Sequence, residues 1–509
     1  MGAYEDVLYD DYSFAEAHPA RIGAVGALFG VRPPTGPIRV LDIGCGLGGH
    51  ILPMAELDPD GEYVGVDLSA PQIALGRQTI DALGLGNARL VCADMRALPE
   101  DLGQFDYIVS HGVYSWVPED ARRAFWHILD RHLAPGGIGY VSYNVYPGWR
   151  HRGTVRDVLT RLVPGPGAAT DRERITAARD VLSVWKGALS DRASHRLAAL
   201  LGELDLLAQT SDAYLLYEHL APLNEPQWLG DVLDQATAAG LSYLGDAELS
   251  SMFPDLAEET RTWVAERAPT LEAAEQVHDL LTHRLFRRSL FVRGTVALDR
   301  HLHWRRLQGL WLFSRVTPVD ETPDTWRSEN GTDLTIEDPA LARAVRLLVQ
   351  RVPAALPFER VLDEVLGPDA PTRDRAALGR GLLQLATRGM IELRTDFPAI
   401  ATSLPDRPRA RAMARLQAAR NEEGAVNLRH ERMKLGATDK AVLAHLDGAH
   451  TRADLLTLLR ERAQDGPVEV RIDGELRTDD DALEHALELV LDRMLRAAFL
   501  FADDEASTP

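Results

Sequence analysis

The chain has little of what marks a membrane-bound or secreted protein. No apolar run approaches the about 20 residues that a membrane-spanning helix needs. The first segment, MGAYEDVLYDDYSF, is acidic and lacks the apolar centre of a signal peptide. Only two cysteines occur, Cys45 and Cys92, and we expect both in core elements and neither in a disulfide. These absences predict a cytoplasmic protein that does not bind membranes.

Basic residues are also in deficit. The chain has 55 lysines and arginines against 76 aspartates and glutamates, so its formal net charge is −21. Lysine occurs only at positions 186, 434 and 440. Because phosphate contacts need a basic surface, this balance argues against general nucleic-acid binding. An acidic surface could attract a basic substrate, although such surfaces serve more often for solubility.

What the sequence does contain is a regular alternation of strand and helix patterns over residues 37–144. Five apolar runs end in DIGCGLGG, VDLS, CADM, SHGVYSW and YVSYN, and helical stretches lie between them. Near-continuous apolar strands that alternate with helices predict a Rossmann-like parallel sheet covered on both faces. Such sheets bind their ligands at the carboxyl ends of the strands.

The first of these strands ends in a glycine-rich turn. Gly44, Gly46 and Gly48 lie between the strand and the next helix, where a ligand must come close to the backbone. Taken alone the run is ambiguous, because Gly44, Gly46 and Gly49 also fit the dinucleotide pattern G-x-G-x-x-G. The turn therefore predicts a nucleotide-like ligand without choosing between cofactors.

Three acidic residues favour S-adenosylmethionine over NAD. Asp42 precedes the glycines, where it would repel a pyrophosphate but attract an amino group. Asp94 ends the third strand, where it can accept a hydrogen bond from an adenine amine. Asp67 ends the second strand and suits ribose hydroxyls, which either cofactor has. The alternative for Asp42 and Asp94 is that each caps the helix that follows.

The motifs DIGCGLGG, VDLS and CADM resemble the cofactor motifs of class I methyltransferases. SHGVYSW, YVSYNVYPGW and the early YDDYSFAEAHPARIGAVGALFG resemble a narrower bacterial family, which joins a methyltransferase core to a methyltransferase regulatory domain. That family includes the protein lysine methyltransferases of rickettsial bacteria. The likeness continues through YEHLAPLNEPQWLGDVLDQ and HRLFRRSLFVRG, and reaches AARNEEGAVNLRHERMKL.

The resemblance implies further cofactor contacts. Tyr9 and His18, in the N-terminal segment, are expected to close over the cofactor like a lid, together with Tyr12 and Pro19. Leu68, Gln72 and Met95 lie in or next to the matching motifs and complete the expected cofactor set. The alternative is an N-terminal arm that only packs on the surface.

Aromatic residues are only 6% of the chain, yet they gather at the ends of the fourth and fifth strands. We expect an aromatic slot for a narrow cationic side chain, because ring faces attract cations. Its members would be Tyr114, Trp116, Tyr143, Tyr146 and Trp149. The alternative is that the strand tyrosines are core and that Trp149 packs against the next segment.

The expected catalytic residues lie on the same two strand ends. His111 could take a proton, since histidine titrates near neutrality, or hydrogen-bond the cofactor. Tyr114 would orient the acceptor, Tyr143 would line the slot, and Asn144 would accept a hydrogen bond from an amine. The fourth strand does not end in Asn-Pro-Pro-Tyr, which counts against methylation of planar amide or base nitrogens. We predict no metal site.

The predicted organisation has four parts: an N-terminal lid segment (1–36), a methyltransferase domain (37–300), a middle winged-helix-like domain (301–400) and a C-terminal one (401–509). Residues 151–222 would form a helical insertion, and RRSLFVRGTVAL would be the final, edge strand of the sheet. Neither winged-helix-like module has a basic recognition helix, so protein contact or dimerisation is expected in place of DNA binding.

We expect a methyltransferase that uses S-adenosylmethionine and acts on a protein or peptide, with lysine as the acceptor. One alternative is N- or O-methylation of a small molecule such as a natural product. Another is a regulatory protein that binds S-adenosylmethionine without catalysis. A homodimer would agree with the resemblance.

Overall fold

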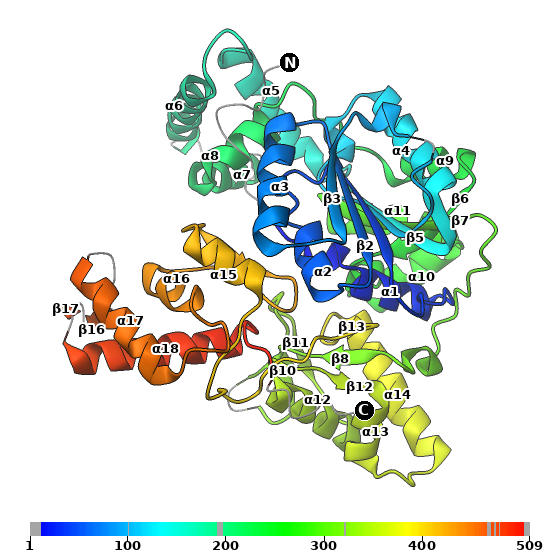
Figure 1. The fold of residues 1–509 in the computed structure, drawn as a ribbon. Coiled ribbons are helices and arrows are strands. Elements are labelled where there is room, and N and C mark those ends of the chain that lie inside the picture. Colours follow the sequence, from blue (N-terminus) through cyan, green and yellow to red (C-terminus); the bar gives the residue numbers. More distant parts are fainter. Residues whose placement is uncertain are drawn as a thin grey trace.

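The computed structural model describes residues 12–99, 101–190, 197–319, 322–465, 470–472, 475–477 and 479–502. The N-terminal part of the chain forms a seven-stranded sheet with helices on both faces (Figure 1). Two smaller, mainly helical parts follow it, so the expected fold class is confirmed.

The sheet has the order β3-β2-β1-β4-β5-β7-β6. Its first five strands pair in parallel, as the continuous apolar runs predict. The strands are β1 (Arg39–Ile43), β2 (Glu62–Asp67), β3 (Ala88–Cys92), β4 (Phe105–Ser110), β5 (Leu133–Asn144), β6 (Leu241–Asp246) and β7 (Phe286–Arg293).

Helices cover both faces of the sheet. α1, α2 and α3 share a core cluster with one face, and α4 and α9 share another cluster with the opposite face. The helices are α1 (Pro19–Leu28), α2 (Ile51–Leu57), α3 (Ala70–Leu83), α4 (Glu119–His132), α9 (Leu229–Ala238), α10 (Glu258–Arg267) and α11 (Leu271–Thr282).

The pattern of α4 shows how the sequence directs this packing. Ala121, Phe125, Ile128 and His132 are buried, at a spacing of three or four residues that places them on one face. The first turn is acidic and the last turn is basic, and both charges complement the helix dipole.

The position of β7 differs from our prediction. We expected it at the edge, but it pairs antiparallel with both β5 and β6, so β6 is the edge strand. Its Arg287 is fully buried and donates to Asp279 at 2.8 Å and to Glu275 at 2.9 Å. This arginine therefore pairs with two buried carboxylates inside the fold.

A helical insertion leaves and rejoins the sheet at the carboxyl end of β5. Gln227 N donates to Asn144 O, and Tyr146 N donates to Gln227 O, both at 2.9 Å. The insertion has its own apolar core. It contains α5 (Trp149–Leu162), α6 (Asp171–Ser190), α7 (Ala198–Gln209), α8 (Asp212–Tyr214) and a π-helical turn, η4 (Leu215–His219).

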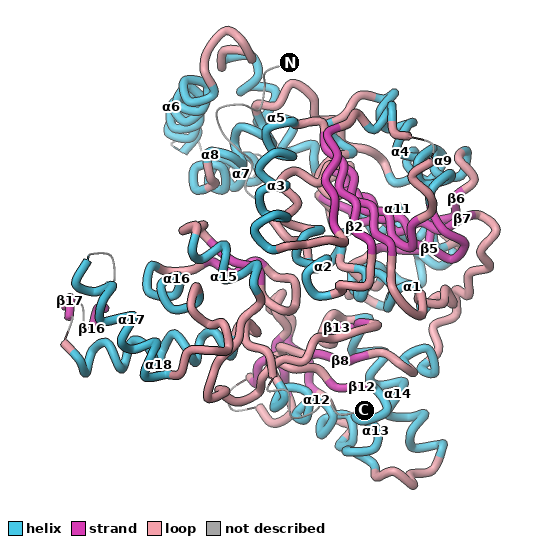
Figure 2. The backbone as a smooth tube through the Cα atoms, viewed as in Figure 1, coloured by secondary structure: helices cyan, strands magenta, loops and turns pink. Residues whose placement is uncertain are grey.

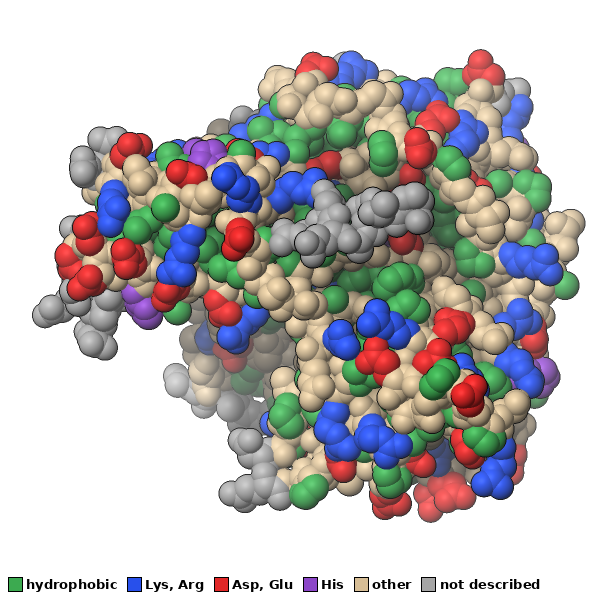
Figure 3. All heavy atoms as spheres, turned by 60° about the horizontal axis from the view of Figure 1, so that its bottom comes forward, with side chains coloured by type: hydrophobic (Ala, Val, Ile, Leu, Met, Phe, Trp, Pro, Cys, Tyr) green, Lys and Arg blue, Asp and Glu red, His purple; other side chains and the backbone are tan. Residues whose placement is uncertain are grey.

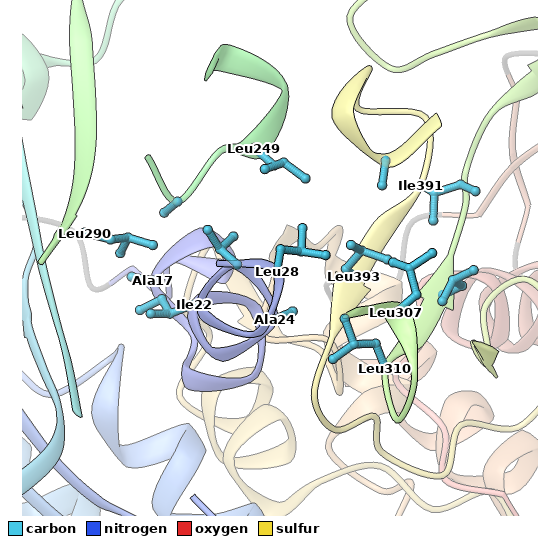
Figure 4. Packing of buried hydrophobic residues seen from close by; sticks show 14 of the residues in the cluster. Ala17, Ile22, Ala24, Leu28, Leu249, Leu290, Leu307, Leu310, Ile391 and Leu393 are labelled. Carbon is cyan, nitrogen blue, oxygen red and sulfur yellow. The ribbon is translucent and has the colours of Figure 1, made fainter. Parts of the chain in front are cut away.

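The middle part shares a continuous core with the sheet. Figure 4 shows α1 lying between Leu290 of β7 and the leucines at 307, 310 and 393. Most of α1 is therefore buried between the sheet and the middle part. The middle part contains α12 (Pro339–Arg351), α13 (Phe358–Leu366), α14 (Thr372–Thr387), a sheet of β12 (Leu356–Pro357), β8 (Trp311–Phe313) and β13 (Glu392–Arg394), and a sheet of β11 (Asp333–Thr335), β10 (Thr325–Arg327) and β9 (Thr317–Pro318).

The C-terminal part has a separate apolar core. Its helices and short hairpins extend away from the sheet, as Figure 2 shows. They are α15 (Ala412–Ala419), α16 (Ala437–Leu443), α17 (Arg452–Asp465), α18 (Asp480–Arg496), β14 (Gly424–Val426) with β15 (Arg432–Lys434), and β16 (Val470–Ile472) with β17 (Glu475–Arg477).

The charged side chains, the cysteines and the helix lengths can be compared with our expectations. Acidic and basic side chains are interspersed over the face drawn in Figure 3. Cys45 is buried, as expected, but Cys92 is exposed because β3 is an edge strand; both cysteines are free. No helix within the described residues is long and apolar enough to cross a bilayer.

Candidate active site

The glycine turn after β1 has the backbone that the sequence predicts. Gly44 and Gly46 have φ angles of +81° and +55°, which residues other than glycine rarely adopt. A Cβ on Gly44 would lie 2.3 Å from Val113 Cγ2 of the β4 loop. Gly44 N donates to Val66 O of β2 at 2.7 Å, which closes the turn onto the neighbouring strand. Gly48 also has a positive φ angle, +93°.

Asp67 at the end of β2 faces this turn. One carboxylate oxygen accepts from Gly46 N at 2.9 Å, and the other accepts from Ser69 N at 2.8 Å. A carboxylate has further lone pairs, so both oxygens can still accept from hydroxyl groups. Leu68 follows with 70% of its side chain exposed, which suits the flat face of an adenine. Gln72 of α3 is buried, with its side-chain oxygen next to Gly46.

The other two acids differ in their surroundings. Asp42 is buried within β1 and does not cap α2, whose N-cap is His50. Asp94 does cap the 3-10 turn η2 (Met95–Ala97), and it also binds the Arg96 side chain at 2.6 Å. That hydrogen bond lowers the pKa of Asp94. Capping is thus what Asp94 does in this structure, and an adenine contact from Asp94 and Met95 stays a prediction.

These residues fit S-adenosylmethionine. The acceptor oxygens of Asp67 suit ribose hydroxyls, and the exposed Leu68 suits the adenine. The turn at Gly44 and Gly46 has no side chains there, so a ligand can come close to its backbone. No group of histidine, cysteine or acidic side chains within the described residues is arranged to hold a metal ion.

The N-terminal contacts are only partly visible. Tyr9 lies outside the described residues. His18 is buried as the N-cap of α1, and its Nδ1 accepts from Ala20 N at 3.1 Å and lies 3.2 Å from an Arg394 nitrogen. Burial and then Arg394 hold the pKa of His18 well below its usual value. This geometry favours a role for His18 in joining the sheet to the later parts of the chain over the predicted lid contact.

His111 directly follows β4 and packs against Phe14 of the N-terminal segment. The two rings stack with centroids 3.6 Å apart, and Nδ1 of His111 lies 2.8 Å from the Tyr140 hydroxyl. Burial lowers the pKa of His111 to about 3, so the ring is neutral at physiological pH. Such a ring is a weak base. The geometry therefore favours the cofactor hydrogen bond over proton transfer.

Two tyrosines of the predicted site lie in the core. The Tyr114 hydroxyl accepts from Trp126 Nε1 at 2.8 Å and donates to Gln235 Oε1 at 2.9 Å, beneath α4 and α9. The Tyr143 hydroxyl is paired with Ser289 of β7 at 2.9 Å. Both side chains are buried and already hydrogen-bonded. Their predicted catalytic roles find no support in this geometry, because both hydroxyl groups are already bonded to other side chains of the core.

Tyr114→Phe is therefore expected to act on stability. Removing the hydroxyl takes the acceptor from Trp126 Nε1 and the donor from Gln235 Oε1, which costs about 1–3 kcal/mol. Urea unfolding would measure this loss, while turnover should stay within about twofold of the wild type. A large loss of turnover at unchanged stability would instead return Tyr114 to the reacting centre.

The remaining ring residues meet at the ends of β4 and β5. Trp116 Nε1 donates to Tyr217 O at 3.2 Å, so the β4 loop is tied to η4. Tyr146 is half-buried beside Trp228, and the Arg150 guanidinium lies 4.3 Å from its ring centre. Trp149 is buried and stacks on His219, which agrees with the alternative that it packs the insertion.

Asn144 connects β5 to an acidic residue that the sequence analysis did not select. Its side-chain nitrogen donates to Asn224 Oδ1 at 3.1 Å, and Asn224 in turn donates to the backbone oxygen of Glu218 at 3.2 Å. Glu218 is half-buried on η4, and π-helical turns occur often at functional sites. Burial raises the pKa of Glu218 to about 7, although Arg152 and Arg156 oppose the shift. The motif YEHLAPLNE was the available signal.

Comparisons with known proteins agree with this geometry. Residues 40–137 match a family described as a methyltransferase domain. Residues 211–293 match a predicted methyltransferase regulatory domain, and residues 406–499 match the C-terminal winged helix domain of PKMT.

Two uncharacterized proteins of Rickettsia prowazekii are similar to this chain. One is 26% identical over 514 residues, which cover 97% of this chain and 92% of the relative. The other is 32% identical over 237 residues, which cover 46% of this chain and 93% of the relative.

A solved structure, PKMT2 from Rickettsia typhi, has a similar fold over nearly the whole length. It superposes with a TM-score of 0.85 at 24% identity, covering 97% of this chain and 100% of that one. The same protein in complex with AdoHcy gives a TM-score of 0.84 at 24% identity, with 97% and 99% covered.

Proposed function

We propose that this chain, which belongs to the class I S-adenosylmethionine-dependent methyltransferases with a methyltransferase regulatory domain, methylates a lysine amine of a protein. The observation that carries the proposal is the half-buried Glu218 on η4, a turn whose backbone accepts hydrogen bonds from Trp116 of the β4 loop and from Asn224, the partner of Asn144 at the end of β5. The winged helix matched to PKMT and the likeness to PKMT2 from Rickettsia typhi support a protein substrate.

The cofactor supplies a methyl group on a sulfonium, which is already activated for displacement. The chain must hold this donor, and Asp67, Leu68 and the glycine turn are placed to do so. Alignment of donor and acceptor can lower the activation free energy by roughly 7–11 kcal/mol. The chain's remaining task is to present an uncharged amine.

Glu218 suits that second task. A lysine amine has a pKa of about 10.4, so keeping it neutral at pH 7 costs about 4.6 kcal/mol. The carboxylate of Glu218 can attract the lysine ammonium and then accept its proton. Because its pKa is about 7, it is a stronger base than an ordinary carboxylate.

Two rings on the loops after β4 and β5 suit a cationic side chain. The face of Tyr146 already holds the guanidinium of Arg150 at 4.3 Å, which shows that this ring can accept a cation. A lysine ammonium on a ring face gains about 0.5–2 kcal/mol. We propose that Tyr146 and Trp116 form the wall along which the acceptor lysine enters.

Glu218→Gln is expected to lower kcat/KM for a lysine-containing acceptor about 100-fold at pH 8. Above pH 7 the wild-type carboxyl is ionised, so kcat/KM should rise with pH through about 7. Glutamine does not titrate, so that inflection should disappear. A pH–rate series with both proteins measures it.

The matched control is Glu259→Gln, which removes an exposed carboxylate on α10 and should leave the pH profile unchanged. Affinity for S-adenosylmethionine should be equal in all three proteins. If Glu218→Gln kept the wild-type inflection near pH 7, the proton would be accepted elsewhere.

Incubation of the protein with methyl-labelled S-adenosylmethionine and a bacterial cell extract tests the substrate class. We expect label in a protein band. Label found only in the small-molecule fraction would contradict the proposal and would favour a natural-product methyltransferase. No transfer to any fraction would leave the protein as a cofactor-binding regulator.

A further inference from the structure

A buried histidine directly follows the glycine turn. His50 is the N-cap of α2 and is only 3% exposed. Its Nδ1 lies 3.3 Å from the Phe14 backbone nitrogen and 3.0 Å from His430 Nε2. A backbone N–H can only donate, so Nδ1 of His50 must be the acceptor. The His430 Nε2 must then donate as well, and the proton of the neutral His50 ring lies on Nε2.

The Nε2–H group of His50 is left without an acceptor. It is buried and makes no hydrogen bond. Buried donors of this kind are rare and call for an explanation. Burial lowers the pKa of His50 to about 4, although Glu16 and a weak contact with the Ala17 backbone oppose the shift, so the ring is a neutral donor and not a cation.

The surroundings of His50 are those of the cofactor site. Its ring centre lies 5.9 Å from that of Phe14, and Phe14 stacks on His111 at the end of β4. His50 therefore follows the glycine turn along the chain and shares Phe14 as a neighbour with His111, and the donor is expected to bind across these two strand ends. Asp67 is an acceptor and suits the ribose hydroxyls. The methionine carboxylate is the strongest hydrogen-bond acceptor that S-adenosylmethionine would still present.

We propose that His50 Nε2–H donates a hydrogen bond to the carboxylate of the cofactor, and that His430 of the C-terminal part positions it. The C-terminal part would thus complete the cofactor site of the sheet. The proposal rests on cofactor binding and does not depend on which acceptor is methylated.

The loop that presents His430 is held in place. His430 has a φ angle of +68°, an unusual conformation for a residue with a side chain. Asn427 stabilises the loop, because its side-chain oxygen accepts from Arg429 N and Glu431 N, each at 2.9 Å. Its side-chain nitrogen donates to Ala497 O at 2.8 Å. Such backbone strain is typical of functional positions.

A second set of contacts fixes this loop against α2. The fully buried Arg411 donates to Glu56 at 3.0 Å and to Asn427 O at 3.0 Å, and it also contacts Pro53 O. Glu56 in turn accepts from Met413 N at the start of α15. Helices α2 and α15 are therefore joined by the same side chains that hold the loop (Figure 1). These bonds connect the loop that carries His430 to α2.

Calorimetric titration with S-adenosylhomocysteine tests the proposal without catalysis. We expect His50→Ala to weaken binding about 10-fold or more, and His430→Ala to weaken it about 3- to 10-fold. The double variant should bind no more weakly than His50→Ala, because His430 acts through His50. Additive losses would overturn the positioning role of His430.

A ligand without the carboxylate separates binding from packing. 5′-Methylthioadenosine lacks the amino-acid part, so wild type and His50→Ala should bind it equally. Equal losses for both ligands would mean that His50 only supports the fold, and the proposal would be wrong. If His50→Ala does not fold, His50→Leu provides the same comparison, because leucine fills the space without a hydrogen-bond donor.

His132→Ala is the matched control. His132 is another buried histidine, on α4, with Nδ1 2.8 Å from Gly103 O and no contact with the glycine turn. It should bind both ligands as the wild type does. The expected affinities do not depend on which group is methylated. If the acceptor is not lysine, the same binding results are still expected, so the two proposals can fail independently.

Discussion

Replacing Asp67 with alanine is expected to weaken S-adenosylmethionine binding about 100-fold or more. The ribose would lose an ionised acceptor, and hydrogen bonds to charged groups contribute about 1.5–3 kcal/mol each. Two such bonds correspond to a factor of about 100 or more in the dissociation constant. The glycine turn would also lose a support, because Gly46 N now donates to this carboxylate at 2.9 Å. Titration calorimetry measures the change.

The matched control for Asp67→Ala is Asp60→Ala. Asp60 is exposed in the turn before β2, at the opposite end of that strand, and its loss should not affect binding. Unchanged affinity in Asp67→Ala would remove this carboxylate from the cofactor site. The exposed Leu68 and the glycine turn would then need another explanation.

Mild acid is expected to destabilise the protein through its buried histidines. The pKa is lowered by burial to about 4 for His50 and to about 3 for His111 and His219. Below pH 6.5 the unfolded chain binds protons at these rings and the folded chain does not. The free energy of unfolding should therefore fall as the pH falls, by about 2 kcal/mol at pH 5 for each ring.

Urea unfolding at pH 7.5, 6 and 5 measures this dependence. Glu218 changes the free energy of unfolding in the opposite direction, because its raised pKa adds stability as the pH falls below 7. It is a single group, however, and several histidines oppose it. The expected net result is a loss of several kcal/mol, a large share of the about 5–15 kcal/mol that a protein usually has. Constant stability from pH 7.5 to 5 would contradict the burial of neutral histidines.

His219 offers a direct check on this account. Both of its ring nitrogens are buried without partners, so His219→Leu should reduce the pH dependence by one group's share. His127→Gln, at an exposed position on α4, should leave the dependence unchanged. A full effect in the second variant would place the titrating group on the surface.

The glycine turn and Asp67 could be predicted because their signals are local. A strand, its turn and the first residues of the next helix lie within a few residues of one another, and each has its own sequence pattern. The parallel sheet followed from the same patterns. The strand order did not: β7 lies between β5 and β6, and neighbouring positions in a sheet depend on tertiary packing.

The aromatic residues show a second limit. β4 and β5 are apolar on both faces, so the sequence could not tell which face a tyrosine would occupy. Tyr143 of β5 and Tyr114 of the loop after β4 looked like site residues, although in the core Tyr114 bonds Trp126 of α4 and Tyr143 bonds Ser289 of β7. His50 and His430 could not be paired at all, because 380 positions separate them along the chain.

Amino-acid analysis of the labelled product tests the central claim most directly. A bacterial extract is incubated with the protein and methyl-labelled S-adenosylmethionine, and the labelled protein is hydrolysed to its amino acids. The account predicts that the label elutes with N-methylated lysine, and that Glu218→Gln reduces the amount. Label in another amino acid, or only in a small molecule, would contradict a lysine acceptor at Glu218.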